Sequence, residues 1–119
     1  MKATPALLKK LRYKPGTPAL ILDPPRGYAA AFSAGTTALG FLQAFVDMPG
    51  TLERALGRLL PLAAPGALVW IAYPKQSSGR KAGVNRDIIR LAAASHGWHT
   101  VAIVALDDTW SALRLRPDS

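Results

Sequence analysis

Short apolar runs alternate with amphipathic stretches along the chain, and this alternation predicts an α/β fold. Apolar runs of four to eight residues are typical of strands buried on both faces. The expected strands cover residues 19–23, 39–47, 67–73, 98–106 and 109–116. The stretches in which apolar residues recur at helical spacing cover residues 4–13, 48–66 and 85–97.

Capping residues mark the ends of these expected helices. Thr4 and Asn85 stand where the first and last helices should begin, and Thr51 is the expected cap of the middle one. Gly97 is a typical C-terminal stop. A further stretch at 26–34 can hold about two turns of helix.

The last two strands are separated by only two aspartates, too little chain for a crossover, so we expect an antiparallel hairpin. Right-handed crossovers place the helices on both faces of the sheet. We expect one domain over residues 1–119: a three-layer, Rossmann-like open sheet, mostly parallel, of about five strands in the order 1-2-3-5-4. The first strand should lie at an edge, where it needs cover or a partner such as a second copy.

Charge is the main compositional signal. The 119 residues carry 15 Lys and Arg against 7 Asp and Glu, a formal charge of +8, concentrated in residues 2–26 and 75–90. This excess of positive charge indicates attraction to polyanions such as nucleic acid. The alternative is that it serves only to keep the protein soluble. The chain has no cysteine, which excludes disulfides and thiolate zinc sites and fits a cytoplasmic protein. No apolar run is long enough to span a bilayer, so we expect no membrane contact.

Polar and aromatic residues gather where the expected strands end. In open α/β sheets, ligands bind beyond the carboxyl ends of the strands. The candidate binding residues there are Asp23, Arg26, Tyr28, Asp47, Tyr73, Lys75, Ser77, Ser78, Asp107, Asp108 and Trp110. They could form a ligand cleft, or they could satisfy one another, with Lys75 pairing with a hairpin aspartate to fix its loop.

The basic loop at 75–90 has serines, glycines and cations ahead of a helix, a weak pattern for binding a phosphate or carboxylate, and a solvated loop is the alternative. It lacks the arrangement of a phosphate-binding P-loop. His96 and His99 have a spacing seen in metal sites, but Gly97 ends the helix between them, so we expect no metal. Trp70 and Trp98 are expected in packing roles.

From about Lys14 to Arg116, the chain resembles a bacterial family of small uncharacterised proteins. The resemblance rests on "LRYKPG", "ALILD", "APGALVWIAYPKQSSG" and "ALDDTWSALRL". That family in turn looks like a shortened form of the fold of class I methyltransferases, enzymes that depend on S-adenosylmethionine (SAM). In that fold the last two strands also form an antiparallel hairpin. The resemblance implies a fold, and no activity is established for the family.

The SAM site that this fold implies is changed in the sequence. Such enzymes bind SAM with a glycine-rich turn after the first strand and an acid after the second. Here Pro24 and Pro25 remove two backbone N–H donors from that turn. Only 15 residues separate Asp23 from Leu39, so we expect the strand that carries the ribose-binding acid to be absent.

The sequence therefore favours a non-catalytic binding or interaction module that lacks a cofactor. The alternative is a small methyltransferase-like enzyme that uses the cleft at the carboxyl ends of the strands. "DPP" followed by Tyr28 is similar to the Asp-Pro-Pro-Tyr motif of amino-group methyltransferases, although Arg26 and Gly27 interrupt it.

Overall fold

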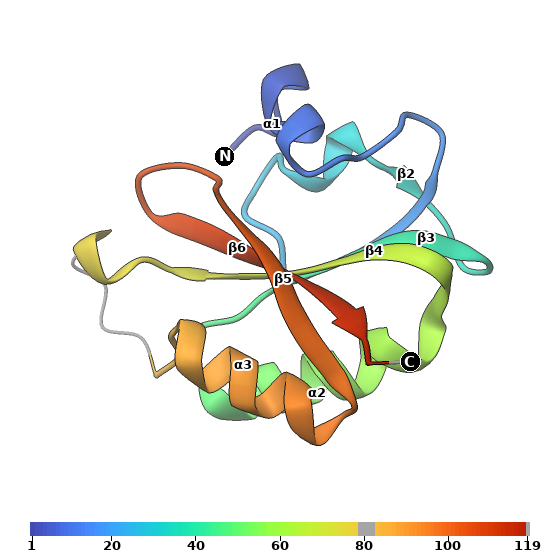
Figure 1. Cartoon of the computed structure of the whole chain (residues 1–119). Helices are drawn as coiled ribbons and strands as arrows, with labels where there is room; N and C mark the ends of the chain where they lie inside the picture. Colours follow the sequence, from blue (N-terminus) through green and yellow to red (C-terminus); the bar gives the residue numbers. More distant parts are fainter. Residues whose placement is uncertain (79–82, 119) are drawn as a thin grey trace.

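A twisted sheet separates two layers in the computed structural model, which describes residues 1–78 and 83–118 (Figure 1). Helix α1 (Pro5–Lys10) lies on one face, together with the turn that follows the first strand. Helices α2 (Pro49–Leu59) and α3 (Arg86–Ser95) cover the other face. None of the described helices is long and apolar enough to cross a membrane.

The sheet has six strands in the order β2-β1-β3-β4-β6-β5. The strands are β1 (Pro18–Leu22), β2 (Ser33–Ala34), β3 (Leu39–Phe45), β4 (Ala63–Pro74), β5 (Trp98–Ala105) and β6 (Trp110–Pro117). The strands β1 to β4 pair with one another in parallel, and β6 is antiparallel to both β4 and β5. The predicted fold class is confirmed, and the five predicted strands have the predicted order.

The short strand β2 corrects two expectations. It pairs with the start of β1, at Pro18↔Ser33 and Ala19↔Ala34, so the first strand is not the edge of the sheet there. The predicted helix at 26–34 is only a 3-10 turn, η1 (Ala29–Ala31). Phe32 explains the difference, because its backbone is extended and its ring packs against those of three core aromatic residues instead of continuing a helix.

Helix caps agree with the sequence at three of four places. The side chains of Thr4 and Asn85 accept hydrogen bonds from the first turns of α1 and α3, and Gly97 follows α3 with a left-handed φ of 78°. The expected cap at Thr51 is wrong, because α2 already begins at Pro49, where a proline loses no helical hydrogen bond. Two 3-10 turns, η2 (Leu60–Leu62) and η3 (Gln76–Ser78), follow α2 and β4.

The two faces of the sheet bury different side chains. The face under α2 and α3 is aliphatic, and the face under α1 is largely aromatic. The aromatic members are Tyr13, Tyr28, Phe32, Phe41, Phe45 and Trp70. Trp70 Nε1 donates a hydrogen bond of 3.1 Å to the Leu11 carbonyl just beyond α1, which fastens the helix to the sheet.

One polar pair is buried in the aromatic layer. The Tyr28 hydroxyl donates to Oε1 of Gln43, and both residues are 0% exposed. Gln43 Nε2 has no hydrogen-bond partner in the described structure. Burial raises the pKa of the Tyr28 phenol well above its ordinary value, and the bond to Gln43 offsets only part of that shift.

Candidate functional site

A cleft opens where β1 and β3 end, and we call it the β1–β3 cleft. Its volume is about 430 Å³, within the usual range for small-molecule sites. The chain continues from β1 to β2 on one side and from β3 to β4 on the other, so the cleft lies at the switch point where open α/β sheets bind ligands. Its lining residues are Asp23, Pro24, Pro25, Phe45, Asp47, Thr51 and Trp110.

Asp23 follows β1 directly and is held in an uncommon conformation. Its φ is +53°, in the left-handed region, although the residue before a proline normally stays extended. The side chain is exposed and makes no hydrogen bond or ion pair within residues 1–78 and 83–118. Backbone strain of this kind costs of order 1 kcal/mol and concentrates at ligand sites, so it supports a functional role for Asp23.

The opposite wall of the cleft combines a carboxylate with aromatic rings. Asp47 lies two residues beyond β3, and its carbonyl accepts a 2.8 Å hydrogen bond from Gly83, which ties the far end of the basic loop to this wall. Phe45 and Trp110 meet edge to face, with ring centroids 5.1 Å apart. Carboxylates beside aromatic rings are the groups that bind organic cations.

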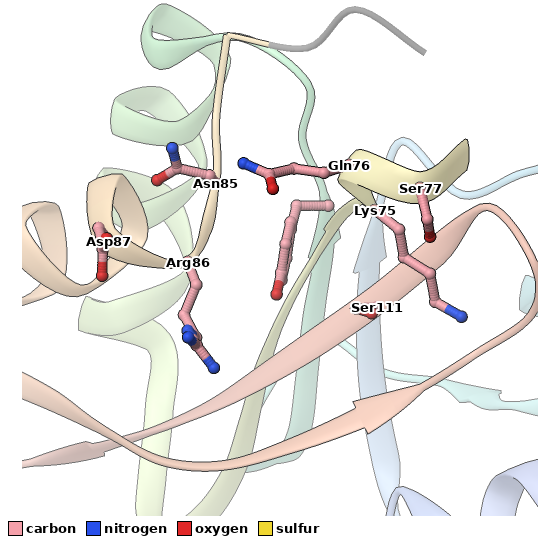
Figure 2. A pocket seen from close by; sticks show the side chains of 8 residues that line it. Lys75, Gln76, Ser77, Asn85, Arg86, Asp87 and Ser111 are labelled. Atoms are coloured by element: carbon pink, nitrogen blue, oxygen red, sulfur yellow. The ribbon is translucent and has the colours of Figure 1, made fainter. Parts of the chain in front are cut away.

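A second cavity, the β4–α3 pocket, lies between the end of β4 and the start of α3. Its volume is about 490 Å³. Figure 2 shows Arg86 entering it from the start of α3, and Lys75 and Ser77 projecting from the segment after β4. The lining is completed by Tyr73, Gln76, Asn85, Asp87 and Ser111.

Tyr73 and Ser111 are buried polar residues of this pocket. Burial raises the pKa of the Tyr73 phenol, while the positive charge of Arg86 and a hydrogen bond with Ser111 lower it by less. The phenol is therefore protonated at neutral pH and can donate a hydrogen bond to a ligand.

The structure divides the candidate residues into three groups. Asp23, Asp47 and Trp110 line the β1–β3 cleft, and Tyr73, Lys75 and Ser77 line the β4–α3 pocket. Arg26, Tyr28, Ser78, Asp107 and Asp108 line neither cavity. Tyr28 is the clearest departure, because it packs in the aromatic core with its hydroxyl on Gln43.

The hairpin is fixed by hydrogen bonds from backbone amides. Asp107 Oδ1 accepts from the amides of Thr109 and Trp110, at 2.8 and 2.7 Å. The amide of Lys75 donates to the Thr109 carbonyl at 2.7 Å, which joins the loop to the hairpin. Among the described ion pairs there is none between Lys75 and a hairpin aspartate. The anion site predicted at 75–90 stays a prediction, and its residues 79–82 lie outside the described residues.

Sequence reasoning missed Phe45, Thr51, Arg86 and Ser111 as lining residues. Arg86 could have been found, because it follows the helix cap Asn85 in the basic segment. Phe45 and Ser111 lie inside strands, where nothing in the sequence distinguishes a residue at a cavity from one in the core.

The two histidines pair with different carboxylates. His96 Nε2 lies 3.1 Å from Glu53, and His99 Nδ1 lies 2.8 Å from Asp118. Each ring therefore has its own acidic neighbour, and the two do not face a common point. The described residues contain no group of three potential metal ligands.

Comparisons with known proteins show what this fold is similar to. No family model and no curated protein sequence matches the chain. A solved structure of LepI in complex with SAM matches with a TM-score of 0.58 at 12% identity, over 94% of this chain and 39% of LepI. A Streptococcus agalactiae protein of the NADB-Rossmann superfamily matches with a TM-score of 0.56 at 9% identity, over 98% of this chain and 69% of the other.

These likenesses confirm a Rossmann-like, methyltransferase-like fold, and they correct one expectation. The sequence favoured a protein that is not an enzyme. That interpretation is overturned, because the matching structures include LepI bound to SAM and a protein described as a pericyclic reaction enzyme. The fold is therefore one that enzymes use. The chain spans about two fifths of the length of LepI.

The residues present fit only part of SAM. The carboxylates and aromatic rings of the β1–β3 cleft suit its sulfonium and ammonium groups. The cleft offers fewer groups that could bind the nucleoside half of SAM, because Pro24 and Pro25 have no backbone N–H to donate. The strand expected to be absent is present as β2, but Gly35, Thr36 and Thr37 follow it, so no ribose-binding carboxylate stands there.

Proposed function

We propose that the chain is a small methyltransferase-like enzyme whose β1–β3 cleft binds a positively charged ligand of the sulfonium or ammonium class. One observation carries the proposal. Asp23, Asp47 and the Phe45–Trp110 pair converge on one cleft at the switch point of the sheet. Two carboxylates and two aromatic rings provide favourable charge and ring faces for a cation.

The distribution of charge supports this choice of ligand. The chain has only 7 acidic residues against 15 basic ones, yet four of the acidic residues lie at the carboxyl ends of the strands or in the hairpin beside them. Two of these, Asp23 and Asp47, line the same cleft. In a strongly basic protein, a cation is drawn to the place where carboxylates gather.

The two carboxylates have separate roles in the proposal. Asp23 stands on the β1 turn without an ion-pair partner in the described chain and holds the charged group of the ligand. Asp47, on the opposite wall, accepts a proton from an amine or hydroxyl that is to act as a nucleophile. The neighbouring β4–α3 pocket, with Arg86 and the protonated phenol of Tyr73, holds a polar or negatively charged part of a second ligand.

The test compares SAM, a sulfonium cation, with S-adenosylhomocysteine, its neutral thioether counterpart. Ligand concentrations about 100-fold above the dissociation constant stabilise the folded state by about 2.7 kcal/mol. We expect a rise in melting temperature that is larger with SAM. The substitution Asp23→Asn, which removes the charge but retains the shape, should reduce the difference between the two ligands.

Asp108→Asn is the matched control, because Asp108 is exposed in the hairpin and lines neither the β1–β3 cleft nor the β4–α3 pocket. It should leave the response to SAM unchanged. Equal stabilisation by both ligands in the wild type and in Asp23→Asn would refute the role of the carboxylate. No stabilisation by either ligand would remove SAM-type cations from the proposal.

A further inference from the structure

Four basic side chains lie at the end of the sheet where the parallel strands begin, opposite the end that carries the β1–β3 cleft. They line two neighbouring hollows of about 290 and 410 Å³, which meet at Gly66 just before the buried part of β4. We call this the cationic surface, and it consists of Arg12, Lys14, Arg114 and Arg116. Within the described chain, none of the four forms an ion pair with a carboxylate.

Strand pairing places two of these arginines side by side. Arg114 pairs with Trp70 of β4, and Arg116 follows two residues later, so both side chains project from the face that α1 only partly covers. Nε of Arg114 is buried without a hydrogen-bond partner in the described residues. Burial and the neighbouring positive charges of Arg12 and Arg116 lower the pKa of Arg114, so both of these guanidinium groups repel that of Arg114.

The backbone of Arg12 has a conformation that favours glycine. It follows the end of α1 with a φ of +63°, a left-handed position that glycine usually occupies after a helix. The fold therefore holds a strained arginine close to two others, and no ion pair with a carboxylate within residues 1–78 and 83–118 offsets the repulsion. This is the behaviour expected of residues kept for an anionic partner.

We propose that the cationic surface binds the phosphodiester backbone of a nucleic acid. Guanidinium groups bind phosphates through two parallel hydrogen bonds, and several cations on one surface can contact successive phosphates of a nucleic-acid backbone. A membrane or an acidic protein fits less well. The exposed large apolar side chains of the described chain, which could serve as anchors for either, line neither hollow.

The experiment measures binding of fluorescent oligonucleotides of mixed sequence, single-stranded and duplex, by anisotropy at several salt concentrations. Binding should weaken as salt rises, and Arg114→Gln should reduce the slope of log affinity against log salt by about 0.7–0.9. At 0.1 M salt, one decade below 1 M, this change in slope corresponds to binding weaker by roughly five- to eightfold. Arg12→Gly should weaken binding similarly without lowering the melting temperature, because glycine suits the left-handed position.

Arg90→Gln is the matched control, because it removes the same charge from α3 on the other face of the sheet. It should leave affinity and salt slope close to those of the wild type. The proposal is overturned if neither oligonucleotide binds at low salt, or if Arg90→Gln weakens binding as much as Arg114→Gln. Binding to anionic phospholipid vesicles or to polyglutamate, but not to oligonucleotides, would also overturn it.

Discussion

The buried Tyr28–Gln43 pair offers a quantitative test of the packing on the α1 face. In Tyr28→Phe the ring contacts remain, but Oε1 of Gln43 loses its donor inside the core. A buried acceptor left without a partner costs about 1–3 kcal/mol. We expect the free energy of unfolding to fall by that amount.

The single substitution Gln43→Met should cost less. It leaves the Tyr28 hydroxyl without its acceptor, but it also removes Nε2 of Gln43, which is already buried without a partner among the described residues. The two effects are similar in size and opposite in sign, so we expect a net change within about 1 kcal/mol. The double variant leaves no unsatisfied polar group and should be at least as stable as the wild type.

Urea denaturation followed by tryptophan fluorescence, to which the buried Trp70 contributes together with Trp98 and Trp110, measures the stability of all four proteins. The cycle should yield a coupling energy of about 2 kcal/mol between Tyr28 and Gln43. If the double variant instead loses the sum of the two single effects, the pair does not interact as described, and the core on this face is packed differently.

Three further predictions concern pH and the backbone. The pKa of Tyr28 is raised in the folded state, so above about pH 10 the folded protein retains the phenol proton while the unfolded chain loses it. The free energy of unfolding should therefore fall as pH rises further. A pH series of urea curves should show a smaller fall in Tyr28→Phe. Asn85→Ala removes the cap of α3 and should lower the unfolding free energy by about 1 kcal/mol in urea, whereas an unchanged value would contradict the cap. Arg12→Gly removes the strain of an arginine in the left-handed conformation and should raise the unfolding free energy by between zero and about 1 kcal/mol in urea. A decrease in the unfolding free energy would contradict the strain.

The fold was largely predictable because its strands are encoded locally. Each apolar run has a length typical of strands, and the two aspartates before Thr109 leave room only for a hairpin. The strand β2 could not be foreseen, since two residues carry no pattern. Its pairing depends on Gly35, where a side chain would lie 2.7 Å from Cβ of Pro18.

The candidate site was predictable in its position and only partly in its members. The rule that ligands bind beyond the carboxyl ends of strands selected Asp23 and Asp47, which line one cleft, and ligand binding by them stays a prediction. It misplaced Tyr28, because the turn after β1 directs this side chain into the core. The cationic surface was missed, because Arg114 and Arg116 lie far in sequence from Arg12 and outside both basic blocks.

The claim that the β1–β3 cleft is the ligand site is tested most directly by an amide chemical-shift titration with SAM. We expect the largest amide shifts at Asp23, Phe45, Asp47 and Trp110, which line the cleft. Shifts confined to the opposite edge of the sheet, around Gly66 and Arg114, or no shifts at millimolar SAM, would contradict it.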